Sequence, residues 1–214
     1  GPTIATGRPS KTSRAARCLD HIIPVDFQGT VQCDGYSAYP SFAKRSDGRI
    51  TLAACWAHAR RKFFELHAAN KSQIAEFALN QLGRVYGVEQ QIKELPQAQR
   101  LEIRQRQSRP ILDSLREWMV LQRQQVAPNS ATAKALDYSL KRWVALTRFV
   151  DDAQLPVDNN WIENQIRPVA IGRNNWLFAG SLRAGQRSAA VMSLIQSARL
   201  NGHDPYAYLR DVLT

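Results

Sequence analysis

The spacing of apolar residues along the chain changes from a period of two to a helical period near residue 55. Between residues 29 and 34, Val31 and Cys33 alternate with polar residues, which predicts a β-strand. Residues 49–55 fit a second strand. From Cys55 onward apolar residues recur three and four positions apart, so we expect helices up to about residue 150.

Residues 67–150 are expected to be helical throughout. Proline-containing breaks are predicted at Pro96, at Pro110 and at residues 128–130. The region has a nearly balanced charge and no motif, which favours an all-helical insertion with a small core of its own. Three apolar stripes are expected to face that core: Ile74, Phe77, Ala78 and Leu82; Leu112, Leu115, Met119 and Val120; and Leu136, Leu140, Trp143, Val144 and Leu146.

The stretch from residue 155 to residue 168 is the most informative part of the chain. Asp158 is a good N-cap, and Pro168 should stop the helix just before it, so a short helix is predicted. This arrangement suits a carboxylate that binds metal or transfers protons, although the spacing alone favours an ordinary capped surface helix with an internal Glu–Arg pair, because such pairs are common. Its polar stripe has members four residues apart: Asn159, Glu163 and Arg167.

The C-terminal residues are expected to begin with a short extended segment, 175–180, and a loop at 181–186. A helix is predicted over 188–200, with Val191, Leu194, Ile195 and Ala198 facing inward. Asp204 followed by Pro205 is the order of an N-cap and a first helical residue, so a last helix should start there.

The chain has 214 residues and a net charge of +11, and the charge is unevenly distributed. Residues 1–64 carry ten basic and four acidic side chains (+6), residues 65–160 thirteen and eleven (+2), and residues 161–214 six and three (+3). A polyanionic partner, above all nucleic acid, would explain basic end segments; the alternative is a basic protein without such a partner. Candidates for phosphate contact are Arg60, Arg61, Lys62, Arg173, Arg183 and Arg187.

Cysteine usage and hydropathy indicate the cellular setting. Cys18, Cys33 and Cys55 are an odd, widely spaced set, which argues against a disulfide framework and favours a reducing cytoplasm. No run of about 18 apolar residues is present, so we expect no transmembrane helix and no membrane partner. Residues 1–26 lack the apolar block of a secretory signal and resemble a basic flexible lead-in.

Two further groups could carry chemistry. Asp34 ends a predicted strand, where open α/β sheets place ligand-binding groups, although an Asp before Gly often only caps a turn. A functional role would need a second carboxylate, which Glu163 could supply if the helices between them are an insertion. Cys55 and His58 have half of a zinc-type spacing; alternatively they pack and hydrogen-bond beneath an active site.

Four stretches, in this order, are similar to one family. They are Val31–Tyr39, Cys55–Phe63, Asp158–Pro168 and Gly172–Gly180, and the closing residues 200–213 also fit. Over about residues 27–213 the chain resembles the insertion sequence 66 family of bacterial transposases, which are of the DDE type.

The resemblance implies an α/β fold with a partial ribonuclease-H-like core, formed by residues 27–66 and 151–214, and a helical insertion at 67–150. It implies DNA strand cleavage and strand transfer with two Mg²⁺ (or Mn²⁺) ions. The partners would be transposon ends and target DNA, with self-association on the DNA. Asp34 matches the second catalytic acidic residue and Glu163 the third, and the supporting residues would be Cys55, His58, Asn160 and Arg167.

The chain departs from the family at the first catalytic aspartate, which belongs to an earlier strand. Asp20 and Asp26 do not follow an apolar run, so neither matches it. We therefore expect a truncated copy or fragment that binds metal weakly and cleaves little DNA alone. Two alternatives remain: a non-catalytic DNA-binding remnant, with steep salt dependence and no response to Glu163→Ala, and a zinc protein that depends on Cys55.

Overall fold

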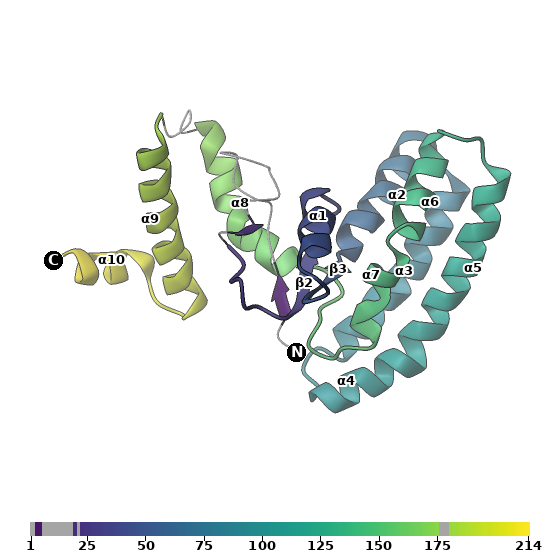
Figure 1. Ribbon diagram of the computed structural model, residues 1–214, viewed down its shortest axis with the longest axis horizontal. Coiled ribbons are helices and arrows are strands. Elements are labelled where there is room, and N and C mark those ends of the chain that lie inside the picture. Colours follow the sequence, from purple (N-terminus) through teal and green to yellow (C-terminus); the bar gives the residue numbers. More distant parts are fainter. Residues whose placement is uncertain (1–2, 6–18, 21, 176–179) are drawn as a thin grey trace. The chain divides into compact units, whose positions relative to one another are not determined.

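The computed structural model describes residues 3–5, 19, 20, 22–175 and 180–214, and only the backbone at 3–5, 169 and 173–175 (Figure 1). These residues divide into two compact units. The first contains residues 3–5 and 19–160, apart from residue 21, and the second contains residues 161–214. Each unit is described by itself below.

The first unit contains a small parallel sheet with the strand order β1-β2-β3. Both predicted strands are present, as β2 (Gly29–Cys33) and β3 (Ile50–Ala54), and Cys33 lies opposite Ala54 in the register. The third strand, β1 (Thr3–Ala5), pairs with β2 on its other edge and lies where we expected only a flexible lead-in. Three residues are too few to show a period of two, so this strand left no signal in the sequence.

The alternation along β2 separates two apolar clusters. Val31 and Cys33 belong to a cluster with helix α1 (Ala38–Arg45), which begins after the tight turn that follows Asp34. Gln32 has the opposite orientation and is completely buried. Its side-chain amide donates to the carbonyl oxygen of Pro156 at 2.7 Å, so one face of the sheet is bonded to the chain just before the Glu163 helix.

Four helices form the body of the first unit and pack side by side (Figure 1): α2 (Trp56–Asn70), α3 (Gln73–Gln91), α5 (Arg109–Gln125) and α6 (Ala131–Leu140). Ser72 and Ser130 cap the starts of α3 and α6 by accepting from amides three residues on. Their core also includes Ala53 of β3 and Leu155 and Val157. The helical region therefore shares a core with the sheet, contrary to our expectation of a separate one.

Most of the predicted inward residues in this region are buried, but Phe77, Val120 and Val144 are exposed. The predicted break at Pro96 is confirmed, since this residue precedes the first turn of a new helix, but Pro110 does not break one. Helix α4 (Gln97–Ile103), a π-helical turn η2 (Arg104–Ser108) and α5 form a continuous helical run. Because the ring of Pro110 would crowd the carbonyl four residues earlier, a wide turn before it lets the run continue. Helix α7 (Trp143–Thr147) and the 3₁₀ turn η3 (Arg148–Val150) end the region.

The second unit consists of α8 (Asn160–Asn175, of which Asn160 belongs to the first unit), α9 (Leu182–Leu200) and α10 (Pro205–Leu213). Helices α9 and α10 pack against each other. The turn that connects them contains Gly202, which has a positive φ of 75°. Asp204 accepts from the amide of Ala207 at 2.8 Å, which confirms the predicted N-cap. Of the described apolar side chains in 161–214, only Ala198 is buried, and Val191 is exposed rather than inward.

Two predicted boundaries in this unit are wrong. Helix α8 continues through Pro168 instead of stopping before it, because a proline removes one hydrogen bond and its neighbours can keep the helical path. The predicted loop at 181–186 is the first part of α9, where Ser181 accepts from the amide of Ala184. Residues 176–179 of the predicted extended segment lie outside the described residues. No helix in the described part of the chain is long and apolar enough to cross a membrane.

Candidate functional site

Asp34 follows directly after β2, at the carboxyl edge of the parallel sheet, and is partly buried. One of its oxygens, Oδ1, accepts a hydrogen bond from the backbone N–H of Tyr36 at 3.0 Å. This is the turn-capping role that an Asp before Gly often has. A carboxylate held in this way has a fixed position at this edge of the sheet.

The helical region contributes two side chains at the turn after Asp34. A Cβ atom added to Gly35 would lie 2.6 Å from the hydroxyl of Tyr138, so a larger residue there would require Tyr138 to move. Arg142 donates to the carbonyl oxygen of Gly35 at 3.3 Å, and its guanidinium lies 4.2 Å from the centre of the Tyr138 ring. Burial raises the pKa of Tyr138, and the charge of Asp34 adds to the shift. Sequence reasoning missed both residues, because more than a hundred positions separate them from Asp34.

The segment that leads to Glu163 is hydrogen-bonded to strand β2 and to helices α2 and α3. Gln32 Nε2 donates to the Pro156 carbonyl, and the N–H of Trp56, the first residue of α2, donates to that of Val157 at 3.2 Å. The hydroxyl of Tyr86 donates to Asp158 Oδ2 at 2.7 Å. Residues 156–158 are thus attached to β2, α2 and α3, within the unit that contains Asp34.

Both carboxylate oxygens of Asp158 accept hydrogen bonds. Besides the Tyr86 hydroxyl it accepts from the backbone N–H of Asn160, the first residue of α8, and from the Asn160 side-chain amide, both at 3.0 Å. It therefore satisfies a donor at the start of the helix, but the helix begins at Asn160, so Asp158 lies one residue before the N-cap position that we predicted for it. Burial and this carboxylate raise the pKa of Tyr86 strongly, so the phenol stays a donor. Three bonds to one carboxylate indicate a structural role.

Cys55 and His58 lie at the start of α2, next to this segment. Cys55 is buried, and burial raises the pKa of its thiol to about 11, although a backbone hydrogen bond from Asn159 acts in the opposite direction. Burial likewise raises the pKa of Cys33 to about 12, and the nearby Asp34 adds to the shift. Neither thiol forms a disulfide. Among the described residues, no three His, Cys, Asp or Glu side chains are grouped as ligands of one metal ion.

Glu163 lies in the first turn of α8 and is partly buried. A carboxylate at this position is favoured by the partial positive charge of the helix start. Arg167 is exposed one turn later. Asp34 and Glu163 belong to the two different units, so their meeting at one cation stays a prediction.

The predicted phosphate contacts are exposed wherever their side chains are described. Arg60, Arg61 and Lys62 form a basic run on α2, and Lys62 also pairs with Glu65 at 3.7 Å. Arg183 and Arg187 are exposed near the start of α9. The side chain of Arg173 lies outside the described residues.

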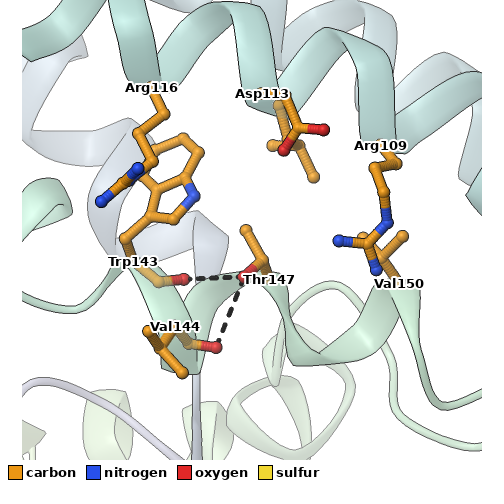
Figure 2. A pocket seen from close by; sticks show the side chains of 8 residues that line it. Arg109, Asp113, Arg116, Trp143, Val144, Thr147 and Val150 are labelled. Carbon is orange, nitrogen blue, oxygen red and sulfur yellow. Dashed lines mark hydrogen bonds between the residues drawn. The ribbon is translucent and has the colours of Figure 1, made fainter.

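A cleft of about 230 Å³ lies elsewhere in the first unit, and none of the predicted site residues lines it. Figure 2 shows Arg109, Asp113 and Arg116 of α5 on one side and Trp143, Val144 and Thr147 of α7 on the other. The Thr147 hydroxyl donates to the carbonyls of Trp143 and Val144, at 3.0 and 3.4 Å. Basic and acidic groups alternate along the α5 side, so the cleft has neither an anion-binding nor a metal-binding pattern.

Comparison with known proteins gives consistent results. Residues 9–187 match the model of a family described as "Transposase IS66 family", and residues 193–214 match the "IS66 C-terminal element". The chain is similar to two uncharacterized proteins of Sinorhizobium fredii (strain NBRC 101917 / NGR234). It is 39% identical to y4qI, over 94% of the chain and 38% of that protein, and 37% identical to y4jD, over 98% and 42%.

The chain thus spans about two-fifths of the length of these curated relatives. No solved structure matches it. Because the family model covers residues 9–187, which include Asp34, the Cys55–His58 pair and Glu163, the chain belongs to the IS66 family of transposases.

Proposed function

We propose that this chain is the part of a DNA transposase that supplies two carboxylates, Asp34 and Glu163, to a divalent-metal site for DNA strand cleavage and strand transfer. The observation that supports this most is the attachment of Pro156 to Gln32 of β2, two residues before Asp34, and of Val157 to Trp56, the residue after Cys55. After the helices of residues 67–150, the chain returns to the carboxyl edge of the sheet just before Glu163.

We propose further that the fold is a partial ribonuclease-H-like core. Residues 27–66 and 151–214 would form the core, and residues 67–150 would be inserted between its second and third acidic positions. The parallel pairing of β2 and β3, with Asp34 following β2, supports this assignment. Parallel sheets place ligand-binding groups at this edge, because the loops there open outward from the strand ends.

The cation of this site would be Mg²⁺ or Mn²⁺, since carboxylate oxygens are the ligands that such ions prefer. A metal pair of this kind activates the attacking oxygen and stabilises the leaving one. Asp34 and Glu163 would bind it, and Asn160 and Arg167 would orient the glutamate. Cys55 and His58, at the start of α2, would pack beneath the metal site and support residues 156–158. The family's first acidic residue has no match in these 214 residues, so we expect the chain alone to bind metal weakly and to cleave little DNA.

The DNA would be held through its phosphates. The basic run Arg60, Arg61 and Lys62 and the arginines of the second unit, Arg173, Arg183 and Arg187, would make these contacts. Such contacts release counterions, so affinity should fall steeply as salt rises. The substrates would be transposon ends and target DNA, with self-association of the protein on the DNA.

The affinity of the chain for DNA, with and without Mn²⁺, tests this proposal. A cation held by Asp34 and Glu163 would attract a phosphate, whereas the empty carboxylates repel it. We expect Mn²⁺ to strengthen DNA binding by the wild-type chain, and Glu163→Ala to remove that gain without weakening binding in EDTA. Glu65→Ala, which changes an exposed acidic residue of α2, is the control and should keep the gain.

The alternative, a DNA-binding remnant without metal chemistry, gives a different result. It predicts that the affinity for DNA is equally salt-dependent in Mn²⁺ and in EDTA. It also predicts that Glu163→Ala leaves this affinity unchanged. A nicking assay on supercoiled DNA tests separately whether cleavage needs the family's first acidic residue, which has no match here. Robust Mn²⁺-dependent turnover that disappears in Glu163→Ala would show that Asp34 and Glu163 need no further acidic residue.

A further inference from the structure

Arg104 is a charged residue with no solvent exposure, located at the first position of the π-helical turn. Its Nε and Nη2 donate to both carboxylate oxygens of Glu89 on α3, at 2.9 and 2.6 Å. Its Nη1 donates to three carbonyl oxygens, those of Phe149 and Asp152 at 2.8 Å and that of Leu155 at 3.0 Å. All three carbonyls belong to one short stretch of chain.

Such an arrangement is a poor means of gaining stability alone. Removing a charge pair from water costs nearly as much as the pair returns, and apolar residues of similar volume often serve as well. The arrangement does specify geometry, because a guanidinium is a rigid, planar fork of donors. Glu89 fixes one side of that fork, and the other side then determines where residues 149, 152 and 155 must lie.

The neighbours of Arg104 extend the same attachment. Gln105 Nε2 donates to the Val150 carbonyl at 2.9 Å and to Asp151 Oδ1 at 2.7 Å, and Arg109 forms an ion pair with Asp151. The next residues along the chain, Pro156, Val157 and Asp158, are hydrogen-bonded to Gln32, Trp56 and Tyr86. Residues 149–158 are thus held almost continuously, and α8 begins two residues later.

The π-helical turn places these donors together. Arg104, Gln105 and Arg109 all lie within or next to it, and all three bond to residues 149–155. Single π turns inside longer helices are rare and occur frequently at functional sites, because the extra residue changes which side chains share a face.

We propose that Arg104, with Glu89 as its counterion, is a positioning residue of the metal site. It fixes the chain that enters α8 and so sets where Glu163 presents its carboxylate. The inference rests on the proposed function, since it assigns a role within that site. Lysine cannot replace Arg104, because one ammonium cannot serve both oxygens of Glu89 and three carbonyls at once.

Arg104→Lys tests the proposal when it is compared with Leu115→Ala. Leu115 is buried in the same apolar core and its side chain has no hydrogen-bonding group, so its loss destabilises the unit without removing a hydrogen bond of the attachment. Amide hydrogen exchange and Mn²⁺ affinity, the latter from the electron paramagnetic resonance of free Mn²⁺, are measured well below both melting temperatures. For Arg104→Lys we expect faster exchange at residues 149–160 and Mn²⁺ affinity about tenfold lower, as outer-shell substitutions produce. Leu115→Ala should keep the wild-type affinity.

The proposal is overturned if exchange at 149–160 matches the wild type, or if it rises while Mn²⁺ affinity is unchanged. It is also overturned if Leu115→Ala weakens Mn²⁺ binding as much as Arg104→Lys, since the effect would then be loss of stability. Failure of the proposed function differs: the wild-type chain would show no Glu163-dependent Mn²⁺ binding, while exchange at 149–160 still rises in Arg104→Lys. If Arg104→Lys does not fold, Gln105→Ala takes its place, because it removes only the exposed part of the attachment. Amide exchange at residues 149–160 must then rise and Mn²⁺ affinity must fall, both by less than expected for Arg104→Lys.

Discussion

The two units of the molecule differ in what holds their elements in place. The first has a continuous core that joins five helices (α2, α3, α5, α6 and α7), strand β3 and the segment that returns at residues 155–157. The second, residues 161–214, has helices of ordinary length, yet Ala198 is its only buried apolar side chain among those described, and Trp161, Ile171 and Leu182 are exposed. Its helices are defined mainly by their caps and by the α9–α10 hairpin.

This difference bears on the proposed site, because its two carboxylates come from the two units. Asp34 is held by a strand, a turn and the core beneath them. Glu163 follows a segment that the first unit fixes by hydrogen bonds, in a helix that otherwise belongs to the second unit. The placement of Glu163 should therefore depend on that attachment more than on apolar packing within residues 161–214.

The largest expected effect compares one leucine from each unit. Leu136→Ala leaves a cavity in the core and should lower the free energy of unfolding by about 2–5 kcal/mol. Leu182→Ala removes a side chain that is 64% exposed and should change it by less than about 0.5 kcal/mol. Urea unfolding followed by circular dichroism measures both. Equal losses would mean that residues 161–214 have a core comparable to that of the first unit.

The next effect is a dependence on alkaline pH that originates in the first unit alone. The pKa values of Cys33 and Cys55 are raised from 9 to about 12 and about 11, so the folded chain holds these protons more tightly than the unfolded chain. Their contribution is therefore complete below pH 9 and is lost as pH rises toward 11–12. At about 1.4 kcal/mol per pKa unit, the part that is lost between pH 8 and pH 11 should be up to about 5 kcal/mol. Chemical unfolding between pH 8 and pH 11 measures it.

The double variant Cys33→Ala, Cys55→Ala is the control for this pH dependence, since it removes both thiols and leaves the other titrating groups. Its stability should decline less over the same range. A decline equal to that of the wild type would assign the alkaline loss to tyrosines or lysines instead.

A smaller effect comes from helix caps of the same kind in each unit. Ser130→Ala and Asp204→Ala each remove a side-chain acceptor at a helix start, worth about 1 kcal/mol. In the first unit the loss should appear in global unfolding. In the second it should appear as faster amide exchange confined to α10, because little packing couples that helix to the rest. Exchange that rises across all of residues 161–214 would show that the unit unfolds cooperatively.

The smallest expected effect concerns a surface ion pair. Lys62 and Glu65 are both about half exposed and one turn apart on α2, so Glu65→Gln should change stability by no more than about 0.5 kcal/mol. DNA affinity should rise slightly, because an acidic group is removed beside the basic run. A fall in DNA affinity would contradict the assignment of this face to phosphate contact.

Local patterns predicted the elements whose causes are local. The alternation at residues 29–34 gave β2, and the Asp204–Pro205 pair gave the start of α10. Rules about single residues failed where neighbours compensate, as at Pro168 inside α8 and Pro110 after the π-helical turn. Strand β1 was too short to carry a pattern.

The carboxylates of the proposed site could be suggested from the sequence, because a strand end and a capped helix mark them. Their supports could not. Gln32, Tyr86 and Arg104 act on residues 45 to 124 positions away, and Tyr138 reaches Gly35 across a similar span. Each of these contacts depends on tertiary packing, and none leaves a periodic signal along the chain.

The most direct test of a shared cation is Mn²⁺ affinity in four chains: the wild type, Asp34→Asn, Glu163→Gln and the double variant. If both carboxylates bind the same ion, either single substitution should weaken binding by about tenfold or more, about 1.4 kcal/mol, and the double substitution should add little to that. Two losses that add independently, or single variants that bind as the wild type does, would show that residues 34 and 163 do not share a site.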